Sequence, residues 1–123
     1  MNRWIQKFRF AFQGLAAVIR TQDSFWVHLP AALLACGLGA WLGLSLPEWG
    51  LLVVVICLVL CLELLNTAIE SLAKGLTSEH NPLVGQALDI AAGATLVAAA
   101  GAVVVGGILF APKLWLLWAA ATG

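Results

Sequence analysis

Charged residues are scarce in this chain. Only six Lys or Arg and six Asp or Glu occur among 123 residues, whereas soluble domains carry about 25% charged residues. The formal net charge is zero, so there is no electrostatic basis for binding nucleic acid. Hydrophobic residues instead make up 63% of the sequence. This balance predicts an integral membrane protein.

Cysteine-based sites are missing as well. Cys36, Cys57 and Cys61 all lie in apolar runs, and no CxxC or Cys/His metal spacing occurs. Cysteines in such surroundings behave as small apolar residues. We therefore expect neither a disulfide nor a metal bound by cysteine.

The hydrophobic pattern predicts an all-α membrane protein with one domain, residues 1–123. Residues 2–22 place Arg and Lys among Trp and Phe, which is typical of an amphipathic helix lying in the membrane interface. A membrane-spanning helix needs about 20 apolar residues. Three segments meet this requirement and are predicted to be transmembrane helices, about 25–42, 51–76 and 83–110.

Short polar segments connect these helices. Asp23 or Ser24 is expected to cap the first transmembrane helix. Residues 44–50 are predicted to form a turn, and residues 77–82, TSEHNP, a polar hairpin. Basic residues on one side of this layout place the N-terminus and the hairpin in the cytoplasm by the positive-inside rule. Lys113 alone lies on the other side, opposite Arg3, Lys7, Arg9, Arg20 and Lys74.

Three polar residues interrupt the apolar segment 51–76. Glu63, Asn66 and Glu70 are spaced so that, at ~100° per residue, they fall within an arc of roughly 60° on one helix face. An ionisable side chain at membrane depth costs on the order of 3 kcal/mol. A polar stripe can join helices through hydrogen bonds, but two carboxylates are costly for that purpose. We interpret the stripe as functional, and Lys74 extends it toward the cytoplasm.

At this point the sequence resembles a known family. Residues 63–94, ELLNTAIESLAKGLTSEHNPLVGQALDIAAGA, are similar to the signature of the small prokaryotic diacylglycerol kinases, which include the undecaprenol kinases. That signature reads approximately E-x-x-N-[ST]-A-I-E, a short S-E hairpin, and G-x-A-K-D-x-[AG]-[AS]-A. Residues 10–29, FAFQGLAAVIRTQDSFWVHL, are more similar to the undecaprenol branch. The GxxxxGK[ST] loop and the HRD and DFG motifs of soluble kinases are absent from the sequence.

The resemblance implies a homotrimer in the bacterial cytoplasmic membrane, with active sites between subunits. It implies transfer of the γ-phosphate of ATP, with Mg²⁺, to the hydroxyl of a lipid such as diacylglycerol or undecaprenol. Glu63 corresponds to the residue that takes the hydroxyl proton, and Glu70 to a metal ligand. Asn66 would orient phosphate or substrate oxygens.

The resemblance also implies nucleotide contacts near the cytoplasmic surface. Arg3 corresponds to a basic residue of the interfacial helix, and Glu79 and Asp89 to positions near the hairpin. His80 and Asn81 in the same hairpin are further candidates, although a solvated His80 is the simpler interpretation. We interpret the remaining histidine, His28, as an interface or packing residue.

Three positions depart from the family pattern. Leu88 stands where the family has a phosphate-contacting lysine, and Lys74 where it has an acidic residue. Gln22 stands where an acidic metal ligand is expected, with Asp23 adjacent. We hypothesise that Lys74 replaces the missing lysine, since Lys serves phosphate as a flexible point charge. Asp23 replacing Gln22 is less favoured, because a one-residue shift rotates a helical side chain by ~100°.

Two alternatives from other classes remain open at this stage. The missing lysine is compatible with a weak or inactive family member that serves as a membrane scaffold. Glu63 and Glu70 are compatible with a small ion or proton pathway. Lipid kinase activity in mixed micelles separates the kinase from both, and ion flux in liposomes separates the two alternatives from each other.

Overall fold

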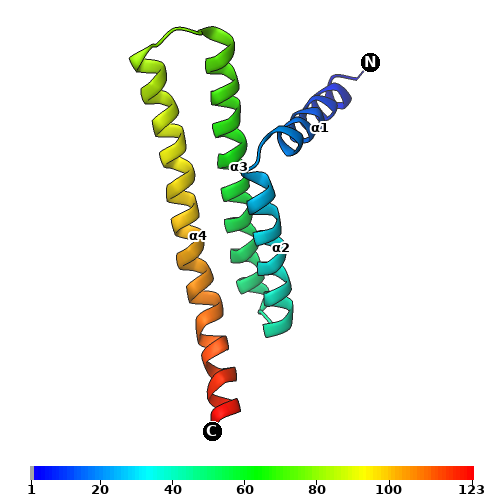
Figure 1. The fold of residues 1–123 in the computed structure, drawn as a ribbon. Coiled ribbons are helices and arrows are strands. Elements are labelled where there is room, and N and C mark those ends of the chain that lie inside the picture. Colours follow the sequence, from blue (N-terminus) through cyan, green and yellow to red (C-terminus); the bar gives the residue numbers. More distant parts are fainter. Residues whose placement is uncertain (1) are drawn as a thin grey trace.

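The computed structural model describes residues 2–123, which form four helices (Figure 1). They are α1 (Arg3–Thr21), α2 (Phe25–Leu42), α3 (Leu46–Leu76) and α4 (Pro82–Thr122). The helices α2, α3 and α4 are each long and apolar enough to cross a membrane. No strand occurs among the described residues. The predicted all-α membrane protein with three transmembrane helices is confirmed.

The first helix projects sideways from the other three (Figure 1). None of its residues is buried, and Trp4, Phe8 and Phe12 stay exposed. The indole N–H of Trp26 donates to the Ile19 carbonyl at 3.1 Å, which ties the end of α1 to the start of α2. An exposed row of aromatic side chains beside basic ones is what an interfacial helix presents to lipid. The predicted helix is present, and its place in the membrane interface stays a prediction.

The turn between α2 and α3 is shorter than predicted. We expected it to cover residues 44–50, but α3 already begins at Leu46. The Ser45 hydroxyl accepts from the Glu48 amide at 3.4 Å, and the Glu48 carboxylate accepts from the Ser45 amide at 3.0 Å. This capping box satisfies two amides at the helix start. Pro47 follows in the first turn, where its missing N–H has no helical partner to lose.

The last helix continues to Thr122, so its predicted end at residue 110 is wrong. Pro112 lies inside α4 without ending it, because transmembrane helices tolerate proline and the residues that follow are good helix formers. Lys113 Nζ lies 3.3 Å from Glu48 Oε1, which joins α4 to the start of α3. At ~1.5 Å per residue the helix is roughly 60 Å long. It therefore extends well beyond the other spans (Figure 1).

The helices bury little surface against one another. The most extensive packing is between α3 and α4, which lie side by side (Figure 1). The buried apolar side chains are Phe25, Leu44, Leu52, Ala91, Ala98 and Leu109. Most other large apolar side chains face outward. A three-helix chain of this kind offers its apolar surface to lipid or to further subunits.

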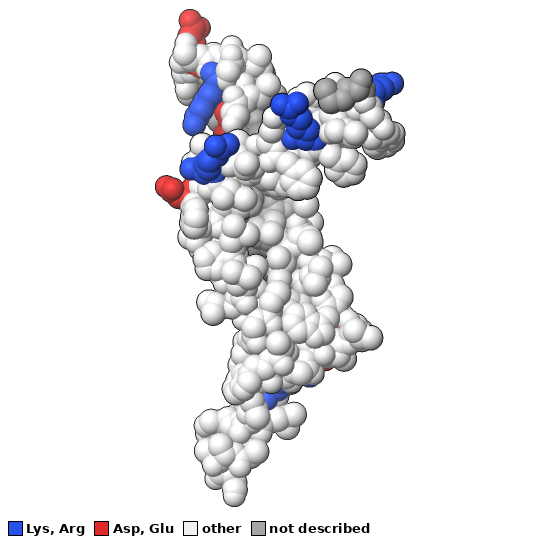
Figure 2. Space-filling view, turned by 90° about the vertical axis from the view of Figure 1, so that its right-hand side faces the viewer, with Lys and Arg blue, Asp and Glu red and all other residues white. Residues whose placement is uncertain are grey.

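Charge is distributed unevenly along the molecule. On the face drawn in Figure 2, Lys and Arg side chains gather at the end that carries the hairpin and α1. A broad belt without charge lies beneath them (Figure 2). This distribution is the one that the positive-inside rule uses to place a membrane protein.

Close packing at Gly39 provides a test of the fold. A Cβ atom there would lie 2.8 Å from Leu44 Cδ1 and 3.1 Å from Trp49 Cη2. We expect Gly39→Leu to lower the stability by about 1–3 kcal/mol through overpacking. The measurement is the midpoint of thermal unfolding in detergent micelles.

The matched control is Gly37→Leu on the same helix. A Cβ atom at Gly37 meets nothing within 4 Å among the described residues. Both variants gain the same helix propensity, so the difference between them reports the packing. Equal midpoints for the two variants would contradict the packing at Gly39.

Candidate active site

The Glu63 carboxylate is contacted by two polar side chains at the start of α2. Ser24 Oγ donates to Glu63 Oε2 at 3.2 Å, and His28 Nε2 lies 3.2 Å from Glu63 Oε1. The exposed fractions of the side chains are 13% for Glu63 and 26% for His28. Both carboxylate oxygens are thus engaged, so a costly group at membrane depth is hydrogen-bonded. The contacts connect the middle of α3 to the beginning of α2.

Sequence reasoning missed both partners of Glu63. Ser24 occupies the N-cap position of α2 but makes no side-chain capping bond, so the capping role considered for it is wrong. Its hydroxyl turns to Glu63 instead. His28, which we interpreted as an interface or packing residue, contacts the carboxylate through its imidazole. The spacing of Ser24 and His28 could have revealed them as a pair, because residues four apart share a helix face.

The other two residues of the polar stripe contact each other. Asn66 Nδ2 donates to Glu70 Oε1 at 3.0 Å. Asn66 Oδ1 is buried and accepts no hydrogen bond within residues 2–123. Leaving a buried acceptor unpaired costs about 1–3 kcal/mol. The Asn66 carboxamide thus spends a donor on Glu70 and leaves its buried oxygen without a partner in this chain.

A polar cavity of about 270 Å³ lies between the ends of α3 and α4 and beneath the hairpin. The hairpin residue Thr77 supports it locally, since its hydroxyl accepts from the Glu79 amide at 3.1 Å. The cavity is lined by five polar residues that the sequence analysis singled out: Glu70, Lys74, Glu79, His80 and Asn81. Leu88, which stands where the family has a lysine, lines it as well. The structure thus brings most of the predicted nucleotide residues to one place.

Three of the predicted residues behave differently. The side chain of Asn81 caps α4, accepting from the Leu83 amide at 3.0 Å and the Val84 amide at 3.4 Å. Its oxygen is therefore committed to the helix start. Arg3 and Asp89 are exposed and line no described cavity. Within one chain, the structure does not bring them to the polar cavity, and their roles stay predictions.

The residues can be tested for their fit to a metal ion. No group of three His, Cys, Asp or Glu side chains suited to a metal occurs within residues 2–123. Mg²⁺ at a nucleotide, however, uses one or two carboxylates together with phosphate oxygens and waters. Glu70 provides one carboxylate at the edge of the polar cavity, and Asn66 Nδ2 donates to that carboxylate. A single carboxylate here fits a metal that arrives with phosphate.

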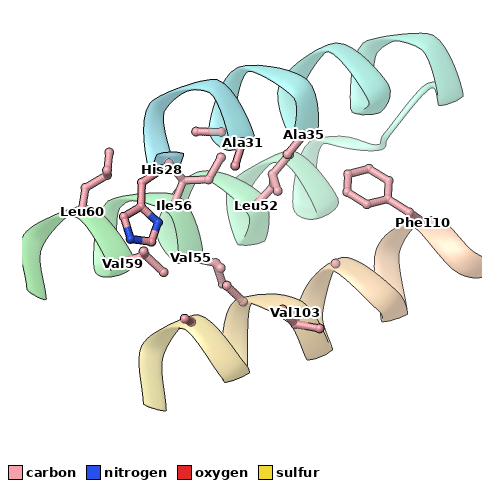
Figure 3. Close-up of a pocket in the computed structure, with 14 residues that line it drawn as sticks. His28, Ala31, Ala35, Leu52, Val55, Ile56, Val59, Leu60, Val103 and Phe110 are labelled. Atoms are coloured by element: carbon pink, nitrogen blue, oxygen red, sulfur yellow. The ribbon is translucent and has the colours of Figure 1, made fainter. Parts of the chain in front are cut away.

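An apolar cavity of about 300 Å³ begins at His28 and runs between α2, α3 and α4 (Figure 3). Its walls include Ala35, Leu52, Val103 and Phe110. Figure 3 shows the imidazole of His28 at one end of the cavity and Phe110 toward the other. Among the described lining residues, His28 alone has a polar side chain. The cavity suits a hydrocarbon chain whose polar end lies near Glu63.

The fold and the site together define a helical membrane protein with a carboxylate site between an apolar and a polar cavity. Residues 9–110 match the family described as prokaryotic diacylglycerol kinase. The chain is 38% identical over 114 residues to the undecaprenol kinase of Bacillus subtilis, covering 93% of each protein.

Two further relatives carry the name diacylglycerol kinase. The protein of Synechocystis is 38% identical over 108 residues, which are 87% of this chain and 62% of the relative. The protein of Escherichia coli K12 is 33% identical over 108 residues, or 88% of each. This chain belongs to the prokaryotic diacylglycerol kinase family and is a lipid kinase embedded in a membrane.

Proposed function

We propose that this chain transfers the γ-phosphate of ATP to the hydroxyl of a long-chain lipid alcohol, undecaprenol or diacylglycerol. The observation that carries the proposal is the polar stripe of α3, which joins the two cavities. Glu63 lies near the end of the apolar cavity, and Glu70 lines the polar one. Seven residues of helix separate them by roughly 10 Å, with Asn66 between.

The apolar cavity supports the acceptor side of the reaction. Its lining residues on α3 run from Leu52 to Leu60, a rise of roughly 12 Å. A lipid chain lying there directs its hydroxyl toward Glu63. The carboxylate takes the hydroxyl proton while the oxygen attacks the γ-phosphorus, and the bond from that phosphorus to ADP breaks. The products are a lipid phosphate and ADP.

The polar cavity supports the donor side. Phosphoryl transfer depends mainly on positioning and on neutralising the phosphate charge. Lys74 supplies a positive charge, and Glu70 would hold Mg²⁺, which neutralises phosphate oxygens when bound. Two other polar residues, Glu79 and His80, line the same cavity and are candidate nucleotide contacts. Arg3 and Asp89 would reach the nucleotide only if another subunit contributes them.

Such a site fits the cytoplasmic face of a bacterial inner membrane, where ATP is available. The gathering of basic side chains at the hairpin end supports this orientation (Figure 2). A homotrimer is the assembly that we propose, because most large apolar side chains of the single chain face outward.

The first prediction concerns the base. Glu63→Gln preserves the size of the side chain but cannot accept the hydroxyl proton. We expect lipid phosphorylation in mixed micelles to fall by ~10²–10⁴, with ATP binding retained. Near-parental turnover in this variant would remove Glu63 as the base. A parent without kinase activity but with its fold intact would favour the inactive scaffold.

The second prediction concerns the metal. Glu70→Ala is expected to raise the Mg²⁺ concentration needed for half-maximal activity and to weaken ATP binding at the same time, since metal and phosphate bind as one unit. Titration of the kinase rate with Mg²⁺ measures the first effect. The matched control is Glu48→Ala at the opposite end of α3. If both variants titrate like the parent, Glu70 has only a structural role.

The third prediction concerns Lys74, which we propose replaces the family lysine that is missing at Leu88. Lys74 and Leu88 line the same polar cavity from α3 and α4, so an ammonium at either position can face the same phosphate. Lys74→Ala is expected to raise the Kd of ATP about 10-fold, the typical effect of losing a charged hydrogen bond. Adding Leu88→Lys to that variant should restore part of the affinity.

Leu88→Lys alone should be neutral or mildly harmful, because two ammonium groups would then share one cavity. Lys113→Ala, which removes a lysine at the far end of the molecule, is the matched control and should leave the Kd of ATP unchanged. Parental ATP affinity in Lys74→Ala would show that this side chain merely extends to the surface of the membrane.

A further inference from the structure

We infer that His28 is a positioning residue for the reaction: together with Ser24, it holds the Glu63 carboxylate in the orientation that receives the proton of the lipid hydroxyl. This inference rests on the proposed function, because it assigns Glu63 as the base. It adds a role for α2 that the signature on α3 does not contain.

The contacts fix the carboxylate from two sides. His28 Nε2 is 3.2 Å from Oε1, and Ser24 Oγ is 3.2 Å from Oε2. A glutamate side chain loses rotational freedom when it is held in this way, and that cost is met before substrate arrives. An ionised carboxylate only accepts hydrogen bonds, so the positioning role requires a proton on Nε2, which the spectroscopic readout below tests.

The surroundings of His28 argue against a packing role. Every other described residue that lines the apolar cavity has an apolar side chain or none. An imidazole at such a wall is costly unless it is hydrogen-bonded. Its side-chain hydrogen bond is to Glu63. A residue needed only to fill space would be apolar here, as its neighbours are (Figure 3).

Room remains at the carboxylate for the substrate. Two carboxylate oxygens offer about four acceptor positions, and the two donors from α2 occupy two of them. The lipid hydroxyl can use another. Since His28 also forms the polar end of the apolar cavity, the same imidazole borders the lipid chain and orients the base.

The two glutamates of the stripe are held differently. Glu70 receives its hydrogen bond from Asn66 on the same helix, whereas Glu63 receives both of its bonds from α2. A change at His28 should therefore disturb the base and leave the nucleotide end unaffected. This separation makes the inference testable through kinetic parameters.

The experiment compares His28→Leu with His28→Gln. Leucine fills the space without donating, and the Gln carboxamide can donate to Oε1. We expect His28→Leu to lower kcat between ~10- and 100-fold, the effect of a misplaced catalytic group, with the KM for ATP unchanged. His28→Gln should recover most of the loss, and Ser24→Ala should lower kcat less than His28→Leu.

The double variant His28→Leu with Glu63→Gln tests whether His28 affects the rate through Glu63. If His28 acts through Glu63, its loss should add little once the base is gone, because residues acting as one unit are not additive. A parental kcat in His28→Leu, or equal losses in His28→Leu and His28→Gln, would overturn the inference. A raised KM for lipid at unchanged kcat would show that His28 binds the chain instead.

A spectroscopic readout does not depend on activity. The imidazole ¹⁵N signals of His28, recorded in micelles, should report an Nε2–H tautomer and should shift in Glu63→Gln. Unchanged signals in that variant would contradict the contact itself. If the contact is present and the parent lacks lipid kinase activity, the proposed function fails. If the parent is active and His28→Leu is normal, the positioning role fails.

Discussion

The cost of placing a carboxylate at membrane depth shapes this molecule. Glu63 is tolerable there because two donors from α2 reach both of its oxygens. These contacts require the start of α2, with Ser24 at its N-cap, to lie against α3 at this depth. The hydrogen bonds thus determine which faces of α2 and α3 meet, and the apolar cavity forms just beyond the contact. The site and the packing of the bundle are parts of one arrangement.

The remaining polar groups follow a gradient along α3. Glu63 is largely buried between helices, Asn66 and Glu70 pair with each other one turn further, and Lys74 is exposed at the polar cavity. The stripe thus runs from a largely buried carboxylate to an exposed ammonium group. A lipid alcohol and a nucleotide have opposite solubilities, and this gradient allows one helix face to meet both. The family to which the chain belongs provides the reaction that needs such a meeting.

Much of this layout could be predicted from the sequence, because membrane spans depend on composition and length. The polar stripe on α3 could be predicted from helical periodicity. The hairpin residues near it could be predicted from the antiparallel order of α3 and α4. The partners of Glu63 could not be predicted, since which face of α2 meets α3 depends on packing. Ser45 and Pro47 were assigned to a turn, but they start α3, because one belongs to a capping box and the other is a first-turn proline. The predicted end at residue 110 was wrong, because α4 continues past Pro112.

The ion pair between Glu48 and Lys113 has a consequence at the opposite end of the molecule. Both side chains must stay near water. A shift of the chain along the bilayer normal that moved Glu48 and Lys113 inward would draw charge into hydrocarbon. Trp115 and Trp118, with ring centroids 5.2 Å apart, lie just beyond Lys113 and favour the headgroup layer. Because α3 is one continuous helix, the depth of Glu48 fixes the depth of Glu63, which lies roughly 22 Å further along it. The outer end of the bundle thereby helps to set the depth of Glu63, the proposed base, in the membrane.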